Sequence, residues 1–300
     1  MAVQIFSSDN GGKSWSPGVQ TIAGEFDGTK MAIHPSQSKV YFAAAKFTED
    51  MKVDVFLTTC GKGDGIGRST VIDSQGKMRS FTQPVVLSNG TLVVPMAGES
   101  GEAWVYVSTT EGQTFSGPFP VTKKLGRAKG YFQLVVDQSQ SPTRDRVYFI
   151  RAAGPAGQYD GIWVNASSDG GQTWSSDIRV DSVASQPQGQ AIVPSAAVNN
   201  AGVLCVSWVD RRHDPRKNDL YATLSLDGGK TFIAPVRVTD ISSDPATPGN
   251  ADVANKFPGG GHYLAMAAKP DGSFQLVWSD SRTGVFQLQT CTLKPEKSEK

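Results

Sequence analysis

Short runs of alternating apolar and polar residues fill this chain. Residues 202–208 and 220–224 are clear examples, and glycine or proline interrupts the sequence between such runs. Alternation with a period of two is typical of half-buried β-strands, and no stretch keeps a long apolar period of 3.6. The pattern therefore predicts an all-β chain.

The strands recur in groups of four. One group comprises residues 192–198, 202–208, 220–224 and 235–238. We count four complete groups, an N-terminal piece that holds only the last two strands of a group, and a C-terminal group of three strands. The C-terminal strands are expected at 263–268, 274–279 and 285–293. Four-stranded units repeated about every 50 residues are typical of a β-propeller.

One motif accompanies the groups, between their third and fourth strands. Its serine and aspartate can accept hydrogen bonds from turn amides, its glycines allow positive φ, and its final aromatic residue is expected to pack back onto the strands. Asn10 can replace the aspartate, Thr110 can do so in part, and residues 58–61 hold a decayed copy. We interpret the motif as a folding device. The four copies span residues 8–15, 108–115, 167–174 and 225–232.

The copies at 167–174 and 225–232 match the Asp box of sialidases and other BNR-repeat proteins, and the resemblance extends over residues 8–293. This resemblance implies a six-bladed β-propeller. Five blades closed by pairing of the chain ends is the alternative. Residues 1–293 are expected to form one domain, followed by a charged, flexible tail at 294–300.

The composition narrows the classes of molecule that the protein could bind. The formal net charge of +1 and the pI near 7.7 give no footprint for nucleic acid, and no apolar run is long enough for a membrane-spanning helix. Cysteines 60, 205 and 291 lack metal-ligand spacing and are expected to be buried thiols; no metal or cofactor is expected. The chain shows no signal peptide, although the resemblance implies an extracellular or periplasmic protein.

Charged residues gather in the loops that follow each second strand. Because strand direction alternates, these loops, such as residues 151–160, share one face with the connections between groups, such as residues 25–27. The spacing Trp-x-Asp-x-Arg occurs in these loops twice. One interpretation is an Asp–Arg pair that staples neighbouring blades, with the tryptophan in the core. The other is a cluster of arginines that grips an acidic sugar through Arg151, Arg212 and Arg282. The candidate substrate-binding residues are Arg151, Arg211, Arg212, Arg282, His213, Asp210 and Asp280.

The resemblance to sialidases also implies catalytic roles. Tyr263 would be the nucleophile, Glu99 or Glu102 its base, and Asp27 or Asp50 the acid. One departure weakens this assignment: the family's first arginine, followed by Ile-Pro, lies ahead of the first Asp box, whereas the first arginine here is Arg68.

These patterns lead to one main functional hypothesis. We expect a carbohydrate-active propeller that binds an acidic glycan and, as a sialidase-like exoglycosidase, hydrolyses terminal sialic acid. The alternative is a non-catalytic propeller that binds a glycan or a protein, because function depends on the site and not on the fold. A polysaccharide lyase is a third hypothesis, which requires His213 or His262 beside Tyr263.

Overall fold

A computed structural model describes residues 2–23, 26–47, 53–61, 66–72, 78–81, 83–98, 102–122, 132–153, 161–182, 191–246 and 264–295. For 2–3, 19–23, 26–29, 45–47, 53–61, 66–68 and 78–81, the backbone alone is described. The chain divides into two compact units. Unit 1 comprises residues 1–99 and 104–119, and unit 2 comprises residues 100–103 and 120–300.

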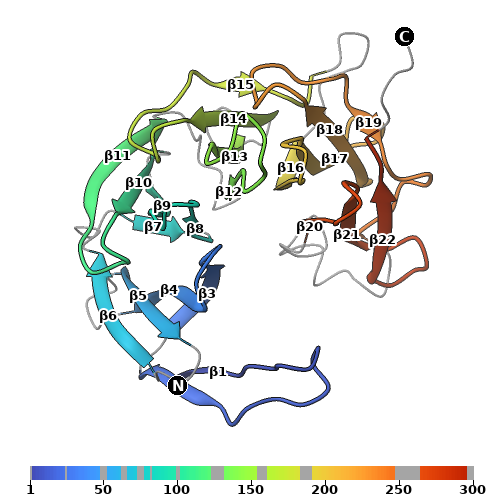
Figure 1. Ribbon diagram of the computed structural model, residues 1–300. Helices are drawn as coiled ribbons and strands as arrows, with labels where there is room; N and C mark the ends of the chain where they lie inside the picture. Colours follow the sequence, from blue (N-terminus) through green and yellow to red (C-terminus); the bar gives the residue numbers. More distant parts are fainter. Residues whose placement is uncertain are drawn as a thin grey trace. The chain divides into compact units, whose positions relative to one another are not determined.

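Unit 1 contains a two-stranded hairpin and two larger antiparallel sheets (Figure 1). The hairpin pairs β1 (Ala2–Ile5) with β2 (Val19–Ala23). The next sheet has the order β3 (Phe26–Ile33), β4 (Lys39–Phe47), β5 (Val53–Gly61), β6 (Ile66–Ile72). The last sheet has the order β11 (Ser116–Thr122), β10 (Ala103–Ser108), β9 (Leu92–Gly98), β7 (Met78–Phe81). A short fifth strand, β8 (Val85–Val86), also pairs with β9.

Unit 2 contains three antiparallel sheets in chain order (Figure 1). The first is β12 (Phe132–Val136), β13 (Val147–Ala153), β14 (Gly161–Ser167) and β15 (Ile178–Arg179). The second is β16 (Ala191–Val198), β17 (Leu204–Asp210), β18 (Asp219–Ser225) and β19 (Val236–Arg237). The third is β20 (Ala265–Ala268), β21 (Phe274–Asp280) and β22 (Gln287–Leu293).

This arrangement confirms the all-β prediction and the grouping of the strands. The described residues form three sheets of four paired strands and one of five, in which β8 is an extra strand on β9; a hairpin precedes these sheets and three strands follow them. Each recognisable Asp box connects two neighbouring strands of one sheet, in the predicted position. The blade number, six or five, and the assignment of residues 1–293 to one domain stay predictions.

The Asp boxes make the local hydrogen bonds expected of a folding device. In the box at 225–232, the Ser225 hydroxyl donates to Asp227 and accepts from the Gly229 amide at 2.8 Å. Asn10 Oδ1 accepts from the Ser14 amide at 2.9 Å, as an aspartate would. Thr110 accepts the corresponding amide bond from Thr114 with its single oxygen. The boxes therefore stabilise the turns between third and fourth strands.

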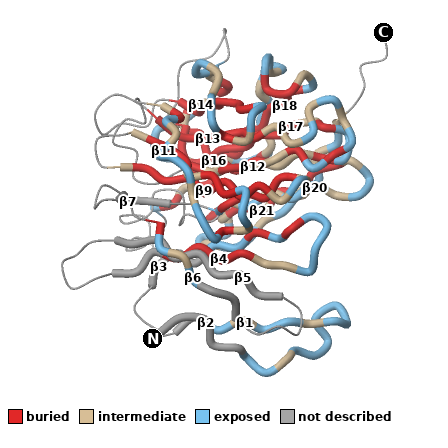
Figure 2. The backbone as a smooth tube through the Cα atoms, turned by 60° about the vertical axis from the view of Figure 1, so that its left-hand side comes forward, coloured by how far each residue is buried: buried red, intermediate tan, exposed pale blue. Residues whose placement is uncertain are grey.

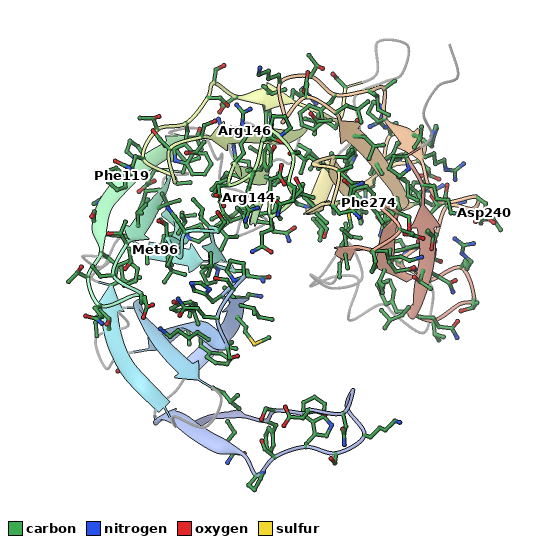
Figure 3. The ribbon with its side chains drawn as sticks, in the orientation of Figure 1. Met96, Phe119, Arg144, Arg146, Asp240 and Phe274 are labelled. Atoms are coloured by element: carbon green, nitrogen blue, oxygen red, sulfur yellow. The ribbon has the colours of Figure 1, made fainter. Side chains whose placement is uncertain are left out.

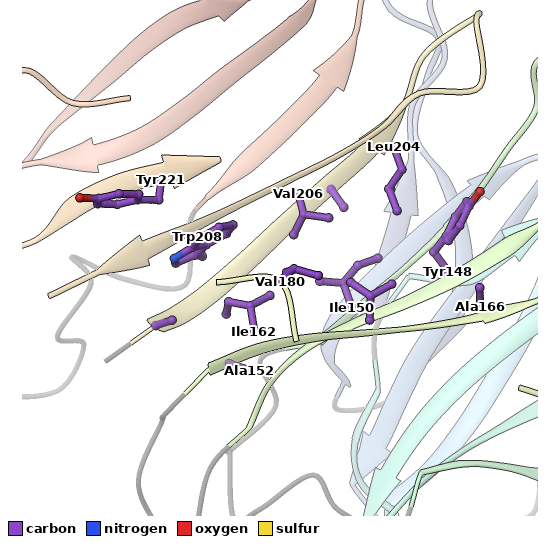
Figure 4. Close-up of a cluster of buried hydrophobic side chains, with 13 residues drawn as sticks. Tyr148, Ile150, Ala152, Ile162, Ala166, Val180, Leu204, Val206, Trp208 and Tyr221 are labelled. Atoms are coloured by element: carbon purple, nitrogen blue, oxygen red, sulfur yellow. The ribbon is translucent and has the colours of Figure 1, made fainter. Parts of the chain in front are cut away.

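Apolar side chains fill the space between neighbouring sheets of each unit. In unit 2, the cluster drawn in Figure 4 joins the β12–β15 sheet to the β16–β19 sheet through residues such as Ile150, Val164, Val206 and Trp208. A second cluster joins the β16–β19 sheet to the β20–β22 sheet and includes Phe274 (Figure 3). Figure 2 shows that the buried residues of unit 2 concentrate in β13, β14, β16, β17 and β18. Strand β17 is buried on both faces because a sheet of unit 2 packs against each of them.

Three sequence expectations need correction. Asp27 and Arg151 were expected in loops, but they lie within β3 and β13. Trp15, which ends the first Asp box, is exposed and does not pack back as the other final aromatic residues do. Cys205 is buried as expected, whereas Cys291 is only half-buried.

The described residues include no apolar helix of the length that a membrane crossing requires.

Candidate ligand-binding site

The first Trp-x-Asp-x-Arg motif forms a buried network at the end of β17. The Asp210 carboxylate accepts from the Trp208 indole N–H at 2.9 Å, from the Arg212 amide at 2.8 Å and from Arg212 Nη2 at 2.6 Å. Arg212 Nη2 also donates to the carbonyl of Asp181, which follows β15 in the preceding sheet. Both side chains of the Asp210–Arg212 pair are buried. Burial alone would lower the pKa of Arg212. The hydrogen bond and the charge of Asp210 outweigh this effect, so the pKa of Arg212 is raised.

The second copy repeats this geometry at the end of β21. Asp280 accepts from the Trp278 indole at 3.1 Å and from the Arg282 amide at 2.8 Å, and it pairs with Arg282 Nη2 at 2.9 Å. Arg282 Nη1 reaches Asp240, which follows β19 in the preceding sheet, at 2.7 Å (Figure 3). The bonds to Asp280 raise the pKa of Arg282. In both copies the contacts match the stapling interpretation.

Arg151, the third arginine of the proposed cluster, is 1% exposed in its side chain and lies in β13. Its guanidinium donates to Asn165 and pairs with Asp177 at 2.8 Å. Burial lowers its pKa, and Asp177 opposes that effect. A substrate carboxylate could reach this guanidinium only by displacing the Asp177 carboxylate, so each arginine of the cluster already has its own carboxylate partner.

The loop between β17 and β18, residues 211–218, is built by local hydrogen bonds. Arg211 Nε donates to Asn218 Oδ1 at 2.8 Å, and Asn218 forms a β-bridge with Ser243. Asp214 accepts from the Arg216 amide at 2.9 Å, and the Lys217 amide closes a turn on the Asp214 carbonyl. We call this segment the basic loop, because it carries four cationic side chains, Arg211, Arg212, Arg216 and Lys217, and one carboxylate.

The basic loop also carries His213, an exposed residue whose ring packs on a buried tyrosine. His213 Nε2 lies 2.5 Å from the Tyr221 hydroxyl of β18. The Tyr221 ring stacks on Trp208, and the Arg212 guanidinium lies 4.3 Å from its centroid. Burial is the main cause that raises the pKa of Tyr221. A buried chain of contacts thus joins Asp210 and Arg212, through Tyr221, to His213 on the loop surface.

The predicted catalytic residues are not brought together by any described contact. Glu99, Asp50, His262 and Tyr263 lie outside the described residues, as does the side chain of Asp27. Glu102 lies one residue before β10. The catalytic roles of all these residues stay predictions, as do the substrate-binding roles of the arginines. Within the described ranges, no group of histidine, cysteine, aspartate and glutamate side chains could hold a metal ion.

Sequence reasoning missed Tyr221. Its only sequence signal was an aromatic residue in an alternating strand, which also describes an ordinary core tyrosine. What distinguishes it is the partner, His213, which lies eight positions earlier on the preceding loop. Antiparallel pairing of Trp208 with Tyr221 places the two residues beside the loop.

No protein-family profile matches the chain, and no curated protein matches it in sequence. Among solved structures, an intramolecular trans-sialidase from Ruminococcus gnavus is similar, with a TM-score of 0.58 and 11% identity over 96% of this chain and 86% of that one. An α-L-arabinofuranosidase from Fusarium graminearum gives a TM-score of 0.55 and 12% identity over 98% and 97% of the two chains. A protein of unknown function from Dyadobacter fermentans gives a TM-score of 0.59 and 13% identity over 93% of this chain and 82% of that one. This likeness shows that the chain has a sialidase-like β-propeller fold.

Proposed function

We propose that this protein binds an acidic glycan through the face that carries the basic loop. The observation that supports the proposal is the loop's construction. Its cations sit on a backbone fixed by hydrogen bonds within the loop and to Ser243. Arg216 is 82% exposed in its side chain. A binding segment that is already ordered pays little conformational entropy when it meets a ligand.

The charge of the loop favours an anionic sugar over a neutral one. Guanidinium groups bind carboxylates in a planar, bidentate geometry, and lysine adds a point charge. The Arg212 side chain is only 2% exposed, so we assign the ligand contacts of the basic loop to Arg211, His213, Arg216 and Lys217. Arg282, with a side chain 21% exposed, is a further candidate on the neighbouring sheet.

Binding is tested by calorimetric titration with two acidic probes, 3′-sialyllactose and trigalacturonic acid. The double variant Arg216→Ala/Lys217→Ala should weaken binding at least about fivefold, because each charged contact contributes on the order of 1 kcal/mol. Lys230→Ala is the matched control, since Lys230 is an exposed cation in the Asp box at the other end of β18. Equal affinities of the double variant and the wild type would contradict the proposal.

The finer proposal is that the protein is an extracellular or periplasmic exoglycosidase that hydrolyses terminal sialic acid. It rests on the resemblance to sialidases and on Tyr263 as the nucleophile. The test is release of a fluorescent aglycone from an α-sialoside, repeated with Tyr263→Phe. Turnover that the substitution abolishes would support it. A folded protein that binds sialyllactose without turnover would support the non-catalytic alternative.

A further inference from the structure

Tyr221 and His213 extend one of two otherwise equivalent networks to the surface. Both sheets hold the same Trp-Asp-Arg contacts. Opposite Trp278, however, β22 has Gln289 where β18 has Tyr221 opposite Trp208. Three positions after the aspartate, the second copy has Thr283 where the first has His213. Since the second copy forms its network without a tyrosine or a histidine, stapling does not explain this pair.

The direction of the hydrogen bond between Tyr221 and His213 follows from burial. The phenol is buried, and burial raises its pKa, so it keeps its proton at neutral pH. No other described residue accepts a hydrogen bond from this hydroxyl. If His213 Nε2 were the donor, the described residues would offer this buried O–H no acceptor, which is costly. The Tyr221 hydroxyl therefore donates, and His213 Nε2 accepts.

This direction fixes the tautomer of the histidine. A neutral imidazole carries its proton on one nitrogen, and the hydrogen bond at one nitrogen decides the state of the other. With Nε2 as the acceptor, the proton of the neutral ring lies on Nδ1. His213 itself is an exposed residue. The phenol itself is held in place by Trp208 and Arg212 on its ring.

We propose that Tyr221 is a positioning residue that fixes His213 as the Nδ1–H tautomer, so that His213 donates a hydrogen bond to an oxygen of a carboxylated sugar. The ligand in this inference rests on the function proposed above. The cations of the basic loop supply attraction without strict direction, whereas the imidazole supplies a hydrogen-bond donor in a fixed orientation. His213 is then the residue that selects an oxygen acceptor at one position of the sugar.

The tautomer is tested without any ligand. Long-range ¹H–¹⁵N spectra of protein labelled at its histidines, recorded at pH 8.5 where an ordinary histidine is neutral, distinguish the two tautomers. The His213 signals are assigned by their loss in His213→Gln. The wild type should show the Nδ1–H form. Tyr221→Phe, which keeps the ring and removes only the hydroxyl, should show an increased share of the Nε2–H form. An Nε2–H form in the wild type, or an unchanged ratio in Tyr221→Phe, would overturn the positioning role.

The ligand contact is tested by titration with 3′-sialyllactose and trigalacturonic acid. His213→Ala should weaken binding of one probe about tenfold, and Tyr221→Phe about threefold to tenfold, as expected for the loss of one hydrogen bond. Thr283→Ala, at the equivalent place in the second copy, should bind as the wild type does. Unchanged affinity in His213→Ala would overturn the contact. If the wild type bound neither probe, the proposed function and the ligand of His213 would fail together, and the spectra would still decide the role of Tyr221.

Discussion

A single carboxylate organises each well-formed Asp-box turn. Asp227 Oδ1 accepts from the amides of Lys230 at 3.0 Å and Thr231 at 2.9 Å, and Oδ2 accepts from the Thr231 hydroxyl at 2.6 Å. Burial alone would raise the pKa of Asp227, but these bonds favour the ionised form and lower the pKa to about 2. The turn is therefore tied to the charge state of one side chain.

This coupling predicts a pH dependence. Because the pKa in the folded state is about 2 and the ordinary value is 3.8, the stabilisation from Asp227 is present above about pH 4 and is lost as the pH falls towards 2. Asp227→Asn should lower the midpoint of thermal unfolding at pH 7, and the difference from the wild type should shrink between pH 4 and pH 2.5. Melting curves over this range measure it. A difference that stays constant with pH would show that the charge has no part in the turn.

Two aspartates in equivalent positions differ in how deeply their arginines are buried. The side chain of Arg212 is 2% exposed, whereas that of Arg282 is 21% exposed and has Asp240 as a second partner. Removing one member of a buried ion pair leaves an uncompensated charge, which typically costs 3–5 kcal/mol.

Asp210→Ala should therefore lower the free energy of unfolding by about 3 kcal/mol or more. Asp280→Ala should lower it by about 1–2 kcal/mol, since Arg282 keeps solvent contact and its other partner. Arg216→Ala is the control, because the Arg216 side chain is 82% exposed and its loss should change the free energy of unfolding by less than about 0.5 kcal/mol. Chemical denaturation measures all three. Equal losses for Asp210 and Asp280 would argue against the role of burial.

At the scale of the element, two outer strands of unit 2 form a matched pair. Ile178 of β15 pairs with Val164, and Val236 of β19 pairs with Ala222. Ile178 and Val236 each lie eleven residues after the serine of the preceding Asp box. Ile178 packs into the core that the next sheet completes with Phe232. Val236, at the matched position, is 52% exposed. Burial at this position thus differs between the two sheets.

The matched positions should respond differently to substitution. Ile178→Ser should destabilise the protein by about 1–2 kcal/mol through lost apolar burial, and Val236→Ser should change the free energy of unfolding by less than about 0.5 kcal/mol. Denaturant titration of both variants tests this. A large loss for Val236→Ser would mean that another surface covers it in solution.

Alternation in the sequence was enough to predict the strands but not their ends. Residues 192–198 were expected in a strand, and β16 spans Ala191–Val198. The outer strand expected at 235–238 is only Val236–Arg237. Arg151 was expected in a loop but lies within β13, and its partner Asp177 lies 26 positions away. Partners at such distances leave no local signal in the pattern.

At the scale of the whole molecule, the fold was predictable and the site was predictable only in part. The Asp boxes repeat a local motif, so the sequence alone revealed the propeller. The arginines were recognisable as residues that bind anions, but whether a guanidinium is already engaged depends on tertiary contacts such as that of Arg212 with Asp181. The pairing of His213 with Tyr221 likewise depends on the register of β17 and β18. The sequence therefore indicated the residue types of the site without their partners.

The overall charge gives the last prediction. The formal net charge is only +1, so attraction of an acidic glycan must come from local charge, and salt should screen it. Affinity for trigalacturonic acid should fall as NaCl rises from 20 to 500 mM. The dependence should be shallower in Arg216→Ala/Lys217→Ala, which removes two cations of the basic loop, and unchanged in Lys230→Ala. Titrations at four salt concentrations measure the slopes. If the wild-type affinity did not depend on salt, the glycan would be held by neutral contacts, and the basic loop would have to be assigned to the stability of the sheet rather than to binding.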